Sequence, residues 1–135
     1  MCKKLIILAI LTLSVLPAFA QQTITRFAFV DADCKPGFAA IESGSAKHVI
    51  SNVFAIEMEP AALLSAEESI GGQFRKAIDE AYPGSRNQFN GVYVYLFSDL
   101  SSAEQKREAK LAEYLSANVG LLDFQTANIS IQPLP

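Results

Sequence analysis

Strand-like and helix-like segments alternate along this chain, and that alternation limits the folds open to it more than any other feature. Residues 23–30 and 47–58 are rich in the β-branched and aromatic residues that strands favour. Residues 92–97, Val-Tyr-Val-Tyr-Leu-Phe, form the clearest strand pattern, and residues 121–124 form a short fourth one. Helix-length amphipathic segments separate the last three of these strands. The order strand, strand, helix, strand, helix, strand predicts an α/β domain.

The two helical segments carry start signals. Ser65 and Glu68 have the spacing of a capping box, in which a hydroxyl and a carboxylate satisfy free backbone N–H groups at the first turn. Ser101 and Glu104 repeat that spacing before the second helix, where Asp99 is an alternative cap. Two helices are therefore expected, the first ending near residue 82 and the second closing at residues 118–120.

Each helical segment has a face that predicts which side chains it buries. The first is expected to bury Ile70, Phe74, Ala77, Ile78 and Ala81. The second is expected to bury Ala103, Leu111, Tyr114 and Leu115. The charged residues expected on its solvent side are Lys106, Arg107, Glu108, Lys110 and Glu113.

Helices between strands are typical of crossover connections, which predict parallel pairing among the last three strands. We expect a small mixed sheet of about four strands with two main helices. Residues 47–58 carry apolar side chains on both faces, so this strand is expected at the centre. Strict alternation would place Val49, Val53 and Ala55 on one face, and Ile50, Phe54 and Ile56 on the other. A ferredoxin-like α+β sandwich is the alternative if the first two strands pair antiparallel.

Residues 1–20 have the pattern of a cleavable secretory signal peptide. A basic Met-Cys-Lys-Lys start precedes an apolar run, and Ala18-Phe19-Ala20 has the A-x-A form of a cleavage site. The apolar run is shorter than the roughly 20 residues that a permanent membrane helix needs. Cleavage after Ala20 would leave one globular domain at residues 21–135. The pattern predicts an exported protein of bacterial type, periplasmic or secreted.

The composition of that domain excludes several functional classes. Loss of Lys3 and Lys4 changes the net charge from -3 to -5, since nine basic residues then face 14 acidic ones. Such a charge disfavours nucleic-acid binding, because phosphate groups need basic partners. With one histidine and no G-x-S-x-G motif, the chain offers neither a multi-histidine zinc site nor a serine nucleophile elbow. We expect a non-enzymatic domain that binds a protein partner, as an adaptor or accessory factor.

Three carboxylates support an alternative function. Asp31 and Asp33 follow the first predicted strand, and Asp99 follows the strand at 92–97. If these two strands are parallel, their carboxyl ends meet at the edge of the sheet where α/β proteins bind ligands. Clustered carboxylates suit Mg²⁺ or Ca²⁺. The alternative function is a divalent-metal-dependent binding module or hydrolase; otherwise these residues serve as turn and cap residues.

The stretch 92–100, VYVYLFSDL, resembles the fourth strand of von Willebrand factor A-type domains, in which an apolar strand ends in Ser-Asp. In that family the Asp contributes to a metal-ion-dependent adhesion site, so the resemblance implies the same role for Asp99. Residues 27–33, FAFVDAD, are similar in position to the family's first strand. Where the family has Asp-x-Ser-x-Ser, residues 31–35 of this chain read Asp-Ala-Asp-Cys-Lys, and both serines are missing.

Cys34 would be the only cysteine after signal cleavage, which excludes a disulfide within the domain. Three alternatives are open for it. It is a buried inert residue, it forms an intermolecular disulfide in a homodimer, or it is a redox-active or nucleophilic thiol paired with His48. Asp31 and Asp33 would oppose a thiolate at this position.

The strand at 92–97 places its two tyrosines on one face. Tyr93 and Tyr95 alternate with Val92, Val94 and Leu96. The tyrosines either form an aromatic binding platform or pack under a helix with their hydroxyls at the rim.

Overall fold

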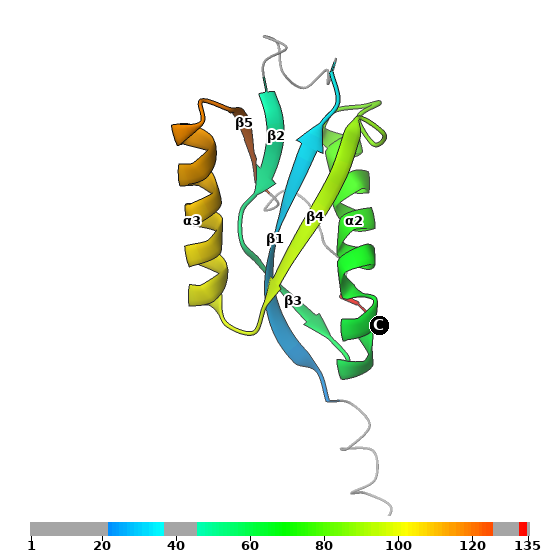
Figure 1. The fold of residues 1–135 in the computed structure, drawn as a ribbon. Helices are drawn as coiled ribbons and strands as arrows, with labels where there is room; N and C mark the ends of the chain where they lie inside the picture. Colours follow the sequence, from blue (N-terminus) through cyan, green and yellow to red (C-terminus); the bar gives the residue numbers. More distant parts are fainter. Residues whose placement is uncertain (1–21, 37–45, 126–132, 135) are drawn as a thin grey trace, which may run out of the picture.

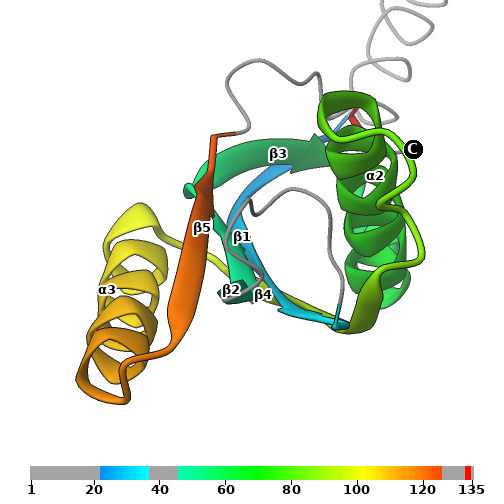
Figure 2. The same cartoon turned by 90° about the horizontal axis from the view of Figure 1, so that it is seen from above.

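The fold is a mixed five-stranded sheet with one helix on each face. The structure, a computed structural model, describes residues 22–36, 46–125 and 133–134. Its elements are β1 (Ile24–Cys34), β2 (Ala46–Ser51), β3 (Phe54–Met58), the 3-10 helix η1 (Pro60–Leu64), α2 (Ala66–Ala81), β4 (Phe89–Phe97), α3 (Leu100–Ser116) and β5 (Gly120–Phe124). Figures 1 and 2 show α2 and α3 on opposite sides of the sheet. The expected α/β class with two main helices is confirmed. The predicted signal peptide, residues 1–20, lies outside the described residues.

β1 is the central strand. It pairs antiparallel with β4 along one edge, and antiparallel with both β2 and β3 along the other. β2 pairs in parallel with β5. β4 runs in the same direction as β2 and β5, but it lies on the other side of β1. The expected parallel pairing therefore holds for β2 and β5 only.

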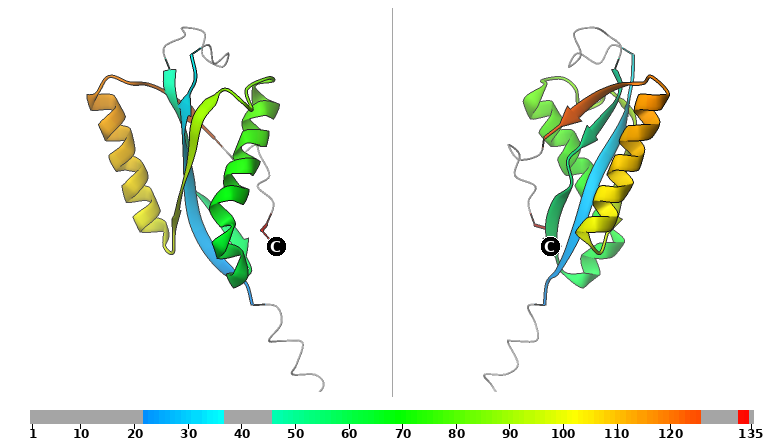
Figure 3. Two further views of the ribbon diagram at one scale, coloured as in Figure 1. Left: turned by 45° about the vertical axis from the view of Figure 1, so that its right-hand side comes forward. Right: turned by 90° about the vertical axis from the view of Figure 1, so that its left-hand side faces the viewer.

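The first two strands do pair antiparallel, which was the condition for a ferredoxin-like sandwich. Such a sandwich, however, keeps its helices on one face of the sheet. Figure 3 shows α3 and α2 on opposite sides, so the molecule has three layers. Within the described ranges, no helix is both long enough and apolar enough to cross a membrane.

The predicted strand 47–58 is interrupted by a β-bulge at residues 51–53. Ile50 lies opposite Asp31, whereas Phe54 lies opposite Ala28. Three residues of this strand therefore oppose two of β1, which is the geometry of a bulge. β2 pairs with the second half of β1, and β3 with the first half.

The bulge reverses the alternation of side chains between β2 and β3. Val49 packs in the same core as Ile56, although strict alternation had placed them on opposite faces. That prediction was wrong because one additional residue shifts the pleat. At the bulge, the hydroxyl of Ser51 accepts a hydrogen bond of 2.8 Å from the backbone N–H of Val30. This contact satisfies a buried donor beside the break in the ladder.

The main hydrophobic core lies between the sheet and α2. The helix contributes Ile70, Phe74 and Ile78, each at most 1% exposed. They pack against alternate residues of β1, namely Ala28, Val30, Ala32 and Cys34. Most of the predicted stripe is confirmed, but Ala81 is exposed at the end of the helix.

The two helices begin and end through different local contacts. Ser65 precedes α2 as predicted, but its side chain makes no capping hydrogen bond because its hydroxyl points back to the carbonyl of Ala62. α3 ends as predicted, with Asn118 at a positive φ of 56° and the N–H of Val119 bonded to the carbonyl of Tyr114 at 2.9 Å. This is the hydrogen bond of a Schellman C-cap.

The face of the sheet under α3 is less apolar than predicted. Leu115, expected in the core, is 72% exposed. Arg107 and Lys110, expected in water, have side chains only 17% and 20% exposed. The long stems of these residues cover the sheet while their charged ends reach polar groups. The helix therefore turns a polar face inward.

Candidate functional site

The structure does not bring the three predicted metal-binding carboxylates together. β1 continues through Asp31 and Asp33 instead of ending before them, and β4 runs antiparallel to β1. Asp31 lies opposite Tyr93, while Asp99 lies beyond the far end of β4 at Phe97. The intervening strand alone spans about 13 Å. The parallel arrangement behind the metal hypothesis is therefore wrong.

No group of three or more His, Cys, Asp or Glu side chains in the described ranges is placed to hold a metal ion. Asp99 instead caps α3. Its carboxylate accepts hydrogen bonds from the backbone N–H of Ser102 at 2.8 Å and from the Ser102 hydroxyl at 2.9 Å. The backbone hydrogen bond, and then the hydroxyl, lower the pKa of Asp99. The alternative prediction that Asp99 is the cap is confirmed, and the expected box from Ser101 is not.

Asp31 lies in a buried cluster with His48 of β2 and Tyr114 of α3, which we call the polar anchor. One carboxylate oxygen lies 3.0 Å from His48 Nδ1, and the other accepts a hydrogen bond from the Tyr114 hydroxyl. Because a carboxylate can only accept, Nδ1 carries the proton in this contact. The two rings stack, with centroids 4.3 Å apart and planes 23° apart. The anchor joins two strands to α3.

Burial explains why each member of the anchor needs the others. Asp31 is 2% exposed, and a buried carboxylate is costly unless hydrogen bonds and opposite charge surround it. Burial, followed by the hydrogen bond to Asp31, raises the pKa of Tyr114. Tyr114 therefore remains a donor across the physiological range. The oriented histidine resembles part of a catalytic triad, but its ring is stacked on Tyr114, and these contacts support a structural role.

Arg107 makes a second polar attachment for α3. Its Nε donates to the carbonyl of Ser51 at 2.7 Å, and a terminal nitrogen donates to Asp123 of β5 at 2.9 Å. The carbonyl belongs to the bulge. The arginine thus joins α3 to both β2 and β5.

Sequence reasoning missed these attachments, although a signal exists. Ala103, Arg107, Lys110 and Tyr114 are spaced by four, three and four residues, which is one face of a helix. Counting only apolar residues hides this face, because two of its four members are charged. Treating the aliphatic stems of Arg and Lys as buriable would have revealed it.

Cys34 and His48 lie on opposite faces of the sheet. The cysteine is 7% exposed in the core beside α2, whereas the histidine stacks on α3. Burial, reinforced by the charges of Asp33 and Asp31, raises the pKa of the thiol to about 11. The structure does not form the thiol–imidazole pair, and the environment favours an inert buried cysteine. The intermolecular disulfide stays a prediction.

The outer edge of β4 is unpaired among the described residues. In the described part of the chain β4 pairs with β1 only, and Figure 1 shows its outer edge at the front, between α3 and α2. We call residues 91–97 the β4 edge. They carry no charged side chain and no proline. Charged side chains and prolines usually protect an exposed edge strand from pairing with another chain, and this segment has neither.

The two tyrosines of the β4 edge differ in exposure. Tyr93 is 56% exposed. Tyr95 stacks on Phe29 with centroids 4.8 Å apart, and the amines of Lys106 and Lys110 lie 5.9 and 5.7 Å from its ring centroid. Tyr95 is packed under α3, as one alternative predicted, and Tyr93 is exposed. That the tyrosines form a binding platform stays a prediction.

The chain matches no protein-family model, no curated protein and no solved structure.

Proposed function

We propose that this chain is an exported, non-enzymatic protein-binding domain and that its binding site is the β4 edge. The single observation that carries the proposal is an edge segment of seven residues without charge or proline, which includes the half-exposed Tyr93. Unprotected edges are templates for strand addition, and recognition domains use them in that way. Export rests on the pattern of residues 1–20.

The chemistry of the edge defines the kind of segment that fits it. Main-chain hydrogen bonds to an added strand supply affinity, and alternate side chains supply specificity. Val92, Val94 and Leu96 pack toward the core beside α2, while Tyr95 and Phe97 stack on Phe29 on the α3 side. An added strand would extend the apolar surface on the α2 side of the sheet and the aromatic surface on the α3 side. The expected ligand is an extended, uncharged segment with apolar side chains on both faces.

The metal-dependent alternative has no comparable support, because Asp99 lies beyond the end of β4, separated along that strand from the level of Asp31 and Asp33. Strand addition requires neither a metal nor a reaction at the site. The protein-binding hypothesis is therefore the one that the described contacts favour.

The test is a binding titration with a fluorescent peptide of alternating Val and Tyr, which carries apolar or aromatic side chains on both faces, measured by anisotropy. We expect Tyr93→Lys to weaken binding at least tenfold, because a charge at an edge strand opposes pairing. Leu64→Lys is the matched control, since Leu64 is 98% exposed on η1, away from β4. Hydrogen exchange should show new protection within residues 91–97. Absence of binding by a monomeric chain, or equal loss in both variants, would overturn the proposal.

A further inference from the structure

We infer that the strand that adds to the β4 edge is the β4 of a second copy of this chain, so that two copies share one continuous sheet. The inference rests on the proposed function, because it names the partner for the same site. The edge fits an extended, uncharged segment with apolar side chains on both faces. The chain itself carries such a segment, residues 91–97, already held in extended form by β1.

A two-fold axis through Val94 pairs the whole segment with itself. In such an antiparallel pair, the numbers of any two opposed residues add up to the same total. The two numbers therefore always differ by an even number. Both members of each pair therefore lie on the same face of the joined sheet. The opposed pairs are Gly91 with Phe97, Val92 with Leu96, and Tyr93 with Tyr95.

These pairs are chemically compatible on both faces. On the α2 side, Val92 meets Leu96, and Val94 meets its own copy, which continues the apolar core. On the α3 side, aromatic rings meet across the strands, an arrangement that stabilises sheets. A Cβ at Gly91 would lie 2.7 Å from the Tyr93 hydroxyl, so the ring of Tyr93 covers this glycine. That ring offers Phe97 of the other copy an aromatic surface.

The charges beside the edge also favour a second copy. The pairing places no two charges opposite each other, because residues 91–97 have none. Lys106 and Lys110 lie at the level of Tyr95. Glu113 lies instead at the level of Tyr93. It is adjacent to Tyr114, whose hydroxyl donates to Asp31, and Asp31 lies opposite Tyr93 in the sheet.

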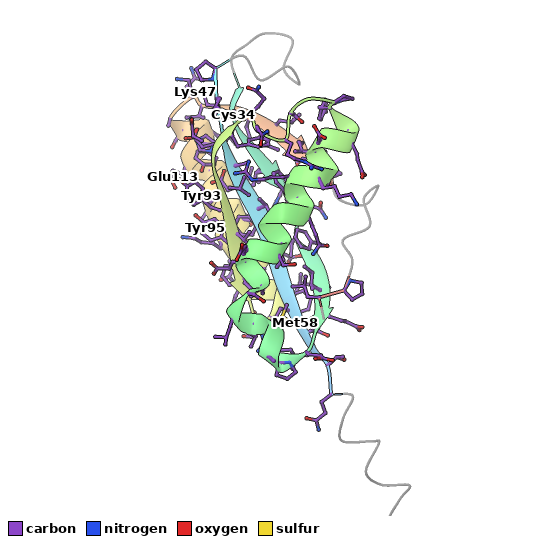
Figure 4. All side chains as sticks on the ribbon, turned by 90° about the vertical axis from the view of Figure 1, so that its right-hand side faces the viewer. Cys34, Lys47, Met58, Tyr93, Tyr95 and Glu113 are labelled. Carbon is purple, nitrogen blue, oxygen red and sulfur yellow. The ribbon has the colours of Figure 1, made fainter. Side chains whose placement is uncertain are left out.

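Figure 4 shows Glu113, Tyr93 and Tyr95 on the same side of the molecule. The two-fold axis exchanges the levels of Tyr93 and Tyr95. Within its own copy Glu113 already lies 3.9 Å from the amine of Lys110. The axis therefore brings Glu113 of each copy toward Lys106, the other lysine beside Tyr95, of the second copy. Opposite charges face each other twice across a symmetric interface.

The first test is the mass of the full chain in solution, expressed with its own residues 1–20 and measured by light scattering and sedimentation. We expect a dimer whose dissociation constant rises at least tenfold in Tyr93→Lys and stays unchanged in the control Leu64→Lys. Circular dichroism checks that both variants fold. A monomer, or a dimer that Tyr93→Lys leaves unchanged, would overturn the inference. So would a dimer that disappears in Cys34→Ser, because a disulfide would then hold it.

The second test reads the register. Tyr93→Cys and Tyr95→Cys are made separately in a Cys34→Ser chain, mixed, and exposed to oxidised glutathione, which accepts the two electrons of disulfide formation. We expect the mixed pair to cross-link faster than either variant alone, because positions 93 and 95 lie opposite each other. Equal rates in all three samples would contradict the register.

The two proposals fail differently. A monomer that binds the Val-Tyr peptide at residues 91–97 overturns the second-copy inference and supports the proposed function. A chain that neither dimerises nor binds the peptide overturns both.

Discussion

The two helices are attached to opposite faces of one sheet by different physical means. α2 buries Ile70, Phe74 and Ile78 in a continuous apolar core. α3 has only two buried side chains, Ala103 and Tyr114, and its polar contacts supply much of the attachment. Figure 3 shows the two helices on either side of the sheet. An apolar sequence pattern therefore identifies the face of the sheet that α2 covers and misses the face that α3 covers.

The difference has consequences for stability. Apolar burial is non-directional and tolerates small movements. The polar anchor is directional, and loss of one partner leaves a buried group without its hydrogen bond. We therefore expect α2 mutations to affect the whole fold and α3 mutations to release one helix.

The largest effect is expected from Phe74→Ala. Phe74 is 1% exposed, and its ring centroid lies 6.0 Å from those of Phe89 and Phe124. Truncation of a buried phenylalanine costs about 3–5 kcal/mol. Urea unfolding should show this loss in a single transition. Lys76→Ala, an exposed change on the same helix, is the control and should leave the midpoint nearly unchanged.

A smaller and more local effect is expected from Tyr114→Phe. It removes the hydroxyl that donates to the buried Asp31 carboxylate, and hydrogen bonds to charged groups contribute about 1.5–3 kcal/mol. Hydrogen exchange should increase mainly in α3 and much less in α2. Tyr93→Phe is the matched control, because Tyr93 is largely exposed. Equal increases in both helices would contradict a local role for the anchor.

The smallest effect is expected for each step of one pH unit in alkaline solution, and it distinguishes the α2 face of the sheet from the α3 face. The pKa of Cys34 is raised to about 11 in the fold, from 9.0 in the unfolded chain. The unfolded state therefore loses this proton first, and stability falls as pH rises from about 9 to 11, by at most about 1.4 kcal/mol per pH unit.

Denaturation at several pH values would check this prediction. Cys34→Ala should remove the part of the decline between pH 9 and 11. Tyr114→Phe should remove a part of the decline in stability that begins at a higher pH, because the ordinary pKa of tyrosine is 10.0 and the fold raises it further. An unchanged slope in Cys34→Ala would show that the thiol is not the titrating group.

Much of the fold could be predicted because its signals are local. The end of α3, most of the buried stripe of α2 and the Asp99 cap follow from spacing within a few residues. The β-bulge could not be predicted, because it depends on how one strand aligns with another. The extension of β1 through Asp31 could not be predicted either, since aspartate is disfavoured in strands. Here hydrogen bonds from His48 and Tyr114 stabilise the Asp31 carboxylate within the strand.

The candidate site was predictable only in part. The alternation that places Tyr93 and Tyr95 on one face is local, and it is confirmed. That β4 is an edge strand depends on its pairing with β1 alone in the described part of the chain. Asp31 and Asp99 were grouped by an assumed strand direction, and the antiparallel pairing separates them.

By itself, the sequence determined which segments form helices and strands and which face of α2 is buried, because periodicity and caps act over one or two turns. Only the tertiary structure decided which strand neighbours which, on which face each helix lies, and that Asp31 accepts bonds from two distant residues. Those outcomes depend on contacts between residues far apart in the chain, such as Asp31 with Tyr114 and Arg107 with Ser51. No local pattern encodes such contacts, because their free energy appears only when the layers pack together.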